Sequence, residues 1–492
     1  MTTSAYPSPV RFAPAPFQNE HKLQTHGALA VLILIPALCI VSNQAGVLRI
    51  VFPLLTIGVG SILLWRSKPL YVGMVFWLWF ITPFLARMAD YQGGWTETSP
   101  VEIAPYATAA LCAIPLLASY HKLATWKKLP YVCALAAILY GFVLGITYLP
   151  LFNVLRALVN WLIPVIFGLF IYENGQLYLE FRRVISKAFL YSTLILGIYG
   201  IYQFFELPEW DRAWMLNVQL NSFGEIDPMK TRAFSTMNAP AIYAAVAACA
   251  VLLLLNLKGK LRLLSAGAGF IGLILTLSRA SWLTLVAGCL YLAVFLGMRE
   301  RFRLMIAAAC CLVFLLGAAQ IPAVNEIIMH RVETFTQPKQ DDSFTARVEG
   351  HETAMRQISQ EPWGEGIGST DTLHNTEGDD DMIGPHDSTL LEFLYSLGWG
   401  GTLIYGVGLF LLGIQLLRAG RGDYFALAGK AILIGLSVQA LLNSIMLGVL
   451  GFMVWTFASM CLAQAEHAEN IKKVSEYYPD EARVLDAAWG SR

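Results

Sequence analysis

The sequence predicts an all-α polytopic membrane protein, a bundle of about 14 transmembrane helices with a large external loop that carries short helices. Three observations support this fold class. Hydrophobic residues make up 56% of the 492 residues, only 14% are charged, and the mean hydropathy is +0.56. The apolar residues gather in runs of about 20, the length that crosses a bilayer. Basic residues lie between alternate runs, as they do beside cytoplasmic loops. This composition excludes a water-soluble enzyme, a disordered chain and a generic nucleic-acid binder.

The apolar runs divide the chain into candidate spans. They are 27–44, 46–65, 69–86, 102–119, 130–149, 151–172, 185–205, 237–256, 262–277, 279–298, 303–322, 388–417, 425–443 and 447–465. No cleavage pattern of small residues follows the first run, so we expect it to be a retained signal anchor. Only a tight hairpin can join runs that are separated by one or two residues.

The basic residues predict the orientation of the bundle. If the chain starts in the cytoplasm, every cytoplasmic segment carries two or more Lys or Arg residues, and the short external links carry almost none. We therefore expect a cytoplasmic tail at 1–26, a bundle over 27–465 and a second cytoplasmic tail at 466–492.

Two external segments, 206–236 and 323–387, are too long to be simple connections, and long loops on a helical bundle are typical of lids or binding elements. The larger loop lies within the bundle domain and is strongly acidic. Its stretch 346–360 predicts a surface helix, because apolar positions recur at spacings of three and four. The residues on that face are Val348, His351, Met355 and Ile358, and Pro362, Gly364, Gly366 and Gly368 then end the helix.

Cysteine usage and acidic clusters bear on metal binding. All eight cysteines lie in apolar runs, and no metal-ligand spacing of Cys and His occurs. Asp379, Asp380 and Asp381 could hold a divalent cation or could simply be solvated. We expect the latter, and so we expect neither a metal nor another cofactor.

Three cationic or titratable residues lie where external helix N-termini are expected. Arg232 precedes the eighth span, Arg279 opens the tenth, and His386 precedes the twelfth. A cation opposes the dipole of a helix N-terminus, so this placement favours a bound anion between them, such as a lipid-linked pyrophosphate. The alternative for Arg279, and for Arg156 inside the sixth run, is an interfacial side chain that reaches water.

His386 could also act in chemistry. A histidine positioned by Asp387 or Glu392 could accept a proton from an attacking hydroxyl. In the alternative, this polar cluster caps the following helix, with Asp387 or Ser388 as the N-cap residue.

Five segments of the sequence resemble the O-antigen ligase-like superfamily, which includes O-antigen ligases and the Wzy-type polymerases of O-antigen and exopolysaccharide. They are RAFSTMNAP at 232–240, LSRASW at 277–282, SFTAR at 343–347, EPWGEGIG at 361–368 and HDSTLLEFLYSLGWGG at 386–401. The family often has Asn and Trp where this chain has Asp387 and His351.

The resemblance implies a GT-C-like, metal-independent glycosyltransferase that uses an undecaprenyl-pyrophosphate-linked donor at the external face of the bacterial inner membrane. By motif, His386 is the expected base, Arg232 and Arg279 hold the pyrophosphate, and Arg347 binds phosphate or sugar. Arg156, Arg87, Glu392 and Asp387 complete the expected substrate-binding set.

The sequence supports three hypotheses in order. The first is a Wzy-type polymerase that moves a growing glycan onto a lipid-linked repeat unit, with a chain-length regulator and export machinery as partners and no nucleic acid. The second is an O-antigen ligase that transfers the glycan to lipid A-core. The third is a transporter of lipid-linked oligosaccharide, which the absence of repeated halves disfavours.

Overall fold

The structure, a computed structural model, describes residues 19–118, 125–218, 221–255, 257, 259–318, 355–356, 358–370 and 388–477. Within these ranges the regular elements are helices, and the strand-type pairing is limited to one bridge between Gly224 and Thr231. The predicted all-α polytopic class is therefore confirmed, whereas the GT-C-like arrangement stays a prediction.

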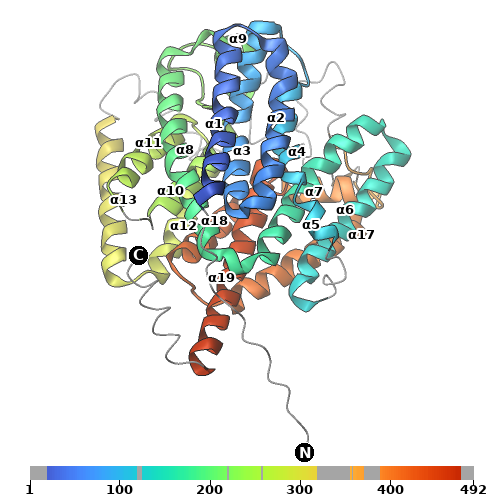
Figure 1. Cartoon of the computed structure of the whole chain (residues 1–492), viewed down its shortest axis with the longest axis vertical. Helices are drawn as coiled ribbons and strands as arrows, with labels where there is room; N and C mark the ends of the chain where they lie inside the picture. The colour runs from blue at the N-terminus through green and yellow to red at the C-terminus, as the bar shows by residue number, and fades with distance from the viewer. Residues whose placement is uncertain are drawn as a thin grey trace, which may run out of the picture.

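Figure 1 shows the bundle, with α9 at one end and the last turns of α19 extending beyond the other. The principal helices are α1 (Asn19–Val41), α2 (Ala45–Arg66), α3 (Lys68–Gly93), α4 (Ile103–Ala110), α5 (Ala113–Leu117), α6 (Leu129–Tyr148), α7 (Leu151–Glu173), α8 (Tyr178–Glu206), α9 (Glu209–Val218), α10 (Pro240–Leu255), α11 (Leu261–Leu275), α12 (Arg279–Phe295), α13 (Met298–Ala318), α17 (Thr389–Arg418), α18 (Tyr424–Gln439) and α19 (Gly448–Tyr477). Short 3-10 helices cover Pro100–Glu102, Trp126–Lys128, Gly175–Leu177 and Asn221–Phe223.

Helices α10 and α19 form the centre of the bundle. From Tyr243 to Leu254 every side chain of α10 is buried, and α19 is the most buried of the long apolar helices. A helix that is apolar all round must be enclosed by others. Helix α10 packs on α8, α11, α12 and α18, while α19 packs chiefly on α7 and α18. Outer pairs such as α6 with α17 complete the bundle.

Fewer described helices than the fourteen predicted spans meet the length needed to cross a membrane. Each of the fourteen apolar runs overlaps helical residues, but within the described residues eight helical stretches, Pro100–Leu117 among them, are long and apolar enough to cross a membrane. Five further apolar helical stretches have 17 residues or fewer, short of the roughly 20 that a bilayer core requires. They are Gly27–Val41 within α1, and helices α10, α11, α12 and α18. Fourteen crossings therefore stay a prediction. Helix α1 begins inside the expected N-terminal tail, and α19 continues to Tyr477, past the expected boundary at 465.

The fourth predicted span, 102–119, is not one continuous helix. It is divided into the 3-10 turn Pro100–Glu102, α4 and α5. Pro115 lacks the N–H that would bond to the carbonyl of Leu111, which instead accepts from Ile114 at 3.1 Å. The helix is therefore interrupted within the run, and the stretch Pro100–Leu117 is still long and apolar enough to cross a membrane, as expected of a candidate span.

The helix predicted over 388–417 is broken. Within α17, Gly398 has a φ of +60° and a non-helical ψ. Residues 361–368, here called the strap, pass against this break and against α6 and α7. Ile367 donates its N–H to the carbonyl of Gly141 at 3.0 Å, and Tyr140 donates its hydroxyl to the carbonyl of Trp363 at 2.9 Å. The sequence predicted only that the strap glycines end a surface helix. In the structure they also let the strap pack against α6, α7 and the break in α17.

The strap replaces the backbone hydrogen bond that the break removes. In a continuous helix, the N–H of Trp399 would bond to the carbonyl of Tyr395. Here Trp399 donates to the carbonyl of Pro362 at 3.0 Å, and Tyr395 accepts from the N–H of Glu365 at 2.9 Å. Both groups stay paired, as buried backbone polar groups must.

Gly398→Ala is expected to destabilise the protein by about 1–3 kcal/mol from backbone strain alone. An added Cβ would also lie 2.2 Å from the backbone carbon and oxygen of Trp363, which have no room to move aside. Thermal unfolding of the purified protein in detergent measures the effect.

Gly400→Ala is the matched control, because a Cβ at Gly400 meets nothing within 4 Å. Equal unfolding temperatures for the two variants would contradict the close packing of the strap against the break at Gly398.

Candidate functional site

Two of the sequence motifs meet beside the N-terminus of α12. Arg232 donates from Nε to the carbonyl of Thr276 at 2.9 Å, and the N–H of Ala233 bonds to the carbonyl of Leu275 at 3.0 Å. Arg232 also donates from Nη1 to the carbonyl of Ser222 at 3.0 Å. The segment that carries Arg232 is thus joined to the one that begins with Thr276 and contains Arg279, although more than 40 residues separate them.

Arg279 is the first residue of α12. Ser278 is the N-cap residue, and its side chain makes no capping hydrogen bond. Leu277 has a φ of +53°, a strained conformation for a residue with a branched side chain. The sharp turn places half-buried Arg279 at a helix N-terminus, where backbone N–H groups carry partial positive charge. With Arg232 attached to the same turn, this end of α12 is suited to binding an anion.

The loop 232–239 has no helix or strand of its own and is held by other elements. Gln203 of α8 accepts from the N–H groups of Phe234 and Ser235 at 2.8 and 2.7 Å. Thr236 donates its hydroxyl to the carbonyl of Phe80 at 2.5 Å. Ser235 adopts a φ of +51°. The Gln203 side chain therefore pairs two backbone N–H groups that a regular element would pair for itself, and a backbone carbonyl of α3 holds the Thr236 hydroxyl.

Arg87, expected to bind substrate, is fully buried beside this loop. Its Nε lies 2.9 Å from Oδ1 of Asp211, and its Nη2 donates to the carbonyl of Ser235 at 2.5 Å. It also donates to the carbonyl of Met237, and its guanidinium lies 4.9 Å from the ring centre of Phe234. These contacts describe a structural anchor, and substrate binding by Arg87 stays a prediction.

Asn238, near the end of the same loop, connects Arg87 with Glu102. Its Oδ1 accepts from Arg87 at 3.2 Å, and its amide donates to Glu102 at 2.6 Å. Exposed Arg156 lies near enough to Glu102 for an electrostatic attraction. Arg156 is therefore linked to the Arg232 loop through Glu102 and Asn238, a connection that the sequence did not reveal.

Glu392 of α17 is another expected site residue that the structure describes. It is fully buried in the first turns of α17, where it accepts from Thr370 at 3.3 Å and Ser396 at 3.4 Å. Ser388 is the N-cap residue of α17, as in one of the alternatives, but its side chain makes no capping hydrogen bond. His386, Asp387 and Arg347 lie outside the described residues, as do Asp379, Asp380 and Asp381.

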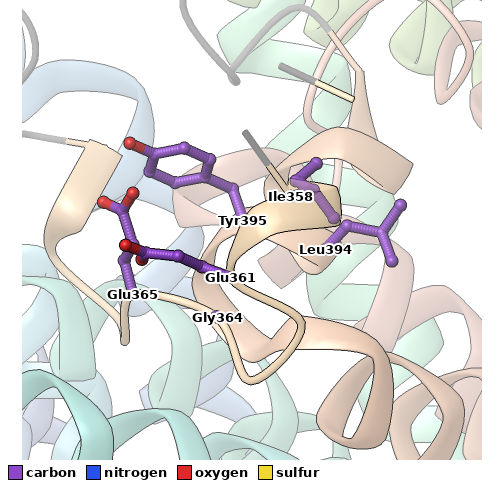
Figure 2. Close-up of a pocket in the computed structure, with 6 residues that line it drawn as sticks. All are labelled: Ile358, Glu361, Gly364, Glu365, Leu394 and Tyr395. Carbon is purple, nitrogen blue, oxygen red and sulfur yellow. The ribbon is translucent and has the colours of Figure 1, made fainter. Parts of the chain in front are cut away.

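A small depression lies where the strap meets α17. Figure 2 shows the carboxylates of Glu361 and Glu365 beside the phenol of Tyr395, with Ile358 and Leu394 on the other side. Burial raises the pKa of Glu365; a hydrogen bond with Tyr395 opposes this shift, and the Glu361 carboxylate adds to it. Ile358, predicted on the apolar face of a surface helix over 346–360, is buried, and 355–356 and 358–360 are the described helical part of that stretch.

Comparison with known proteins finds a family model that matches part of the chain, including Arg279. Residues 264–406 match the family model described as O-antigen ligase. The resemblance is thereby confirmed for this part of the chain, here called the O-antigen ligase region. No curated protein sequence matches the chain.

The O-antigen ligase region contains Arg279, Glu392, the strap and the break in α17. Arg232 and Arg87 lie before it. The contact between Arg232 and Thr276 therefore joins a residue outside the O-antigen ligase region to a turn inside it.

Proposed function

We propose that this protein is a Wzy-type polysaccharide polymerase. It would transfer a growing glycan from undecaprenyl pyrophosphate to a lipid-linked repeat unit at the external face of the bacterial inner membrane. The observation that carries the proposal is the attachment of the Arg232 loop to the turn before Arg279, at the N-terminus of α12. This arrangement of two guanidinium groups and a helix N-terminus suits a pyrophosphate leaving group.

The proposed reaction needs charge stabilisation and one proton acceptor. An acceptor hydroxyl oxygen attacks the anomeric carbon, and the bond from that carbon to the pyrophosphate oxygen breaks. The electron pair remains on the pyrophosphate, where preorganised Arg232 and Arg279 stabilise the growing charge. His386 accepts the hydroxyl proton, and attack from the opposite face inverts the anomeric centre. The donor is already activated, so neither a metal nor another cofactor enters the scheme.

The remaining assignments belong to the same proposal. Both termini lie in the cytoplasm, and the site faces the periplasm. The partners are the lipid-linked donor and acceptor, membrane lipid, a chain-length regulator and export machinery.

The purified protein, supplied with lipid-linked repeat units and no ion gradient, is expected to lengthen them. Electrophoresis of the released glycans measures chain length. Unchanged chains, together with ion-coupled transport of the same lipid in vesicles, would replace this proposal with a transporter.

The second candidate is an O-antigen ligase, favoured by the description of the matching family. A deletion strain separates the two. Single repeat units on the surface lipid indicate loss of a polymerase, whereas accumulated full-length polymer on the lipid carrier indicates loss of a ligase.

A further inference from the structure

The loop that carries Arg232 is fastened to a buried polar cluster outside the O-antigen ligase region. At its centre is Asp211 of α9, whose side chain is fully buried. Its carboxylate accepts from the hydroxyl of Tyr199 at 2.7 Å and from the amide of Gln203 at 2.6 Å, and it forms the ion pair with Arg87. A buried carboxylate is tolerated only when its charge is compensated in this way.

Gln203 transmits this arrangement to the loop. Its side chain is fully buried, its amide nitrogen is held by Asp211, and its amide oxygen receives two consecutive backbone N–H groups. Those N–H groups belong to Phe234 and Ser235, two and three residues after Arg232. Because Asp211 requires a donor from Gln203, the amide can have only one orientation, with its oxygen toward the loop.

Arg87 holds the loop from the other side. It donates to the carbonyls of Ser235 and Met237, so the same short segment is bound through its N–H groups by Gln203 and through its carbonyl groups by Arg87. The loop has few conformations left, and Arg232 is presented to Thr276 before any ligand arrives. Preorganised charge of this kind avoids reorganisation when an anion binds.

We propose that Gln203 and Asp211 are positioning residues, which set the Arg232 loop against the N-terminus of α12 and so determine how tightly a pyrophosphate group is held. This inference rests on the proposed function. Neither residue touches the anion. They act through the backbone of the loop.

The test is Gln203→Met, which keeps the length of the side chain and removes both of its hydrogen-bonding functions. Binding of inorganic pyrophosphate to the full-length protein in detergent is measured by titration calorimetry, with thermal unfolding recorded in parallel. We expect the dissociation constant for pyrophosphate to rise about tenfold. Asp211→Asn is expected to act in the same direction, since it leaves the orientation of the Gln203 amide undetermined.

Gln439→Met is the matched control. Gln439 is an equally buried glutamine in α18, and its side-chain oxygen accepts from Thr284 at 3.1 Å. Its replacement should lower the unfolding temperature without changing pyrophosphate affinity. A merely structural role for Gln203 would give the same result as this control and would overturn the inference.

The outcomes also separate this inference from the proposed function. If the unaltered protein binds no pyrophosphate, the proposed function fails, and the inference fails with it. If the unaltered protein and Gln203→Met bind pyrophosphate equally, the inference is wrong and the proposed function stands.

Discussion

Arg279→Ala is expected to abolish polymer formation while the protein stays in the membrane at its normal level. Arg279 lies at the N-terminus of α12, beside the turn to which Arg232 is bonded. Loss of one preorganised donor to a developing negative charge costs about a hundredfold to a thousandfold in rate, enough to remove visible polymer. Surface glycan, analysed by electrophoresis of whole-cell extracts, measures the effect.

Arg303→Ala provides the control for Arg279→Ala. Arg303 is an exposed arginine of α13 on the expected cytoplasmic side, so its replacement should leave polymer length unchanged. Normal polymer from Arg279→Ala would refute the anion site.

His386→Ala is expected to have the same phenotype as Arg279→Ala for a different reason, because the acceptor hydroxyl would lose its proton acceptor. The pH dependence of the residual rate distinguishes them. A variant at Arg279 should keep the titration of the base, and His386→Ala should lose it. Normal polymer from His386→Ala would refute its role as the base and would favour the alternative, in which the polar cluster around it caps the following helix.

Arg87→Ala is expected to lower the free energy of unfolding by about 3–5 kcal/mol, because it leaves the buried charge of Asp211 uncompensated. It also removes the donors to the carbonyls of Ser235 and Met237. Thermal unfolding in detergent and the amount of protein in the membrane measure the loss.

Lys230→Ala is the control for Arg87→Ala. Lys230 pairs with Glu225 at 2.7 Å, but both side chains are more than half exposed, and exposed ion pairs contribute little. If Arg87→Ala left stability unchanged and weakened only substrate affinity, Arg87 would be a binding residue, as the sequence predicted, and the anchor role would be wrong.

The positions of the helices follow from the sequence because hydrophobicity is a local property. A run of apolar residues must satisfy its own backbone in lipid, and an α-helix does so within the run. Each of the fourteen runs accordingly overlaps helical residues. Local chemistry also locates breaks, but only in part. Pro115 interrupts the fourth run. The structure shows this interruption, because the carbonyl of Leu111 pairs with the N–H of Ile114.

The direction in which a charged side chain points does not follow from the sequence. Arg87 and Arg279 both lie in or beside apolar runs, and both were expected to bind substrate. Arg87 is buried against Asp211, whereas Arg279 is the first residue of α12 and is only half-buried. The choice depends on Asp211 and the 235–238 segment, more than 100 residues away from Arg87, and no local pattern records that partner.

The sequence by itself determined the helical class, the apolar runs and the arginine motifs, since each depends on neighbours within one or two turns. The tertiary structure decided that the Arg232 loop is bonded to the turn before α12, that Gln203 and Arg87 hold this loop, and that the strap replaces a hydrogen bond in α17. The physical reason is common to all three. Backbone groups that a loop or a broken helix leaves unpaired must find partners elsewhere, and only the packed structure specifies those partners.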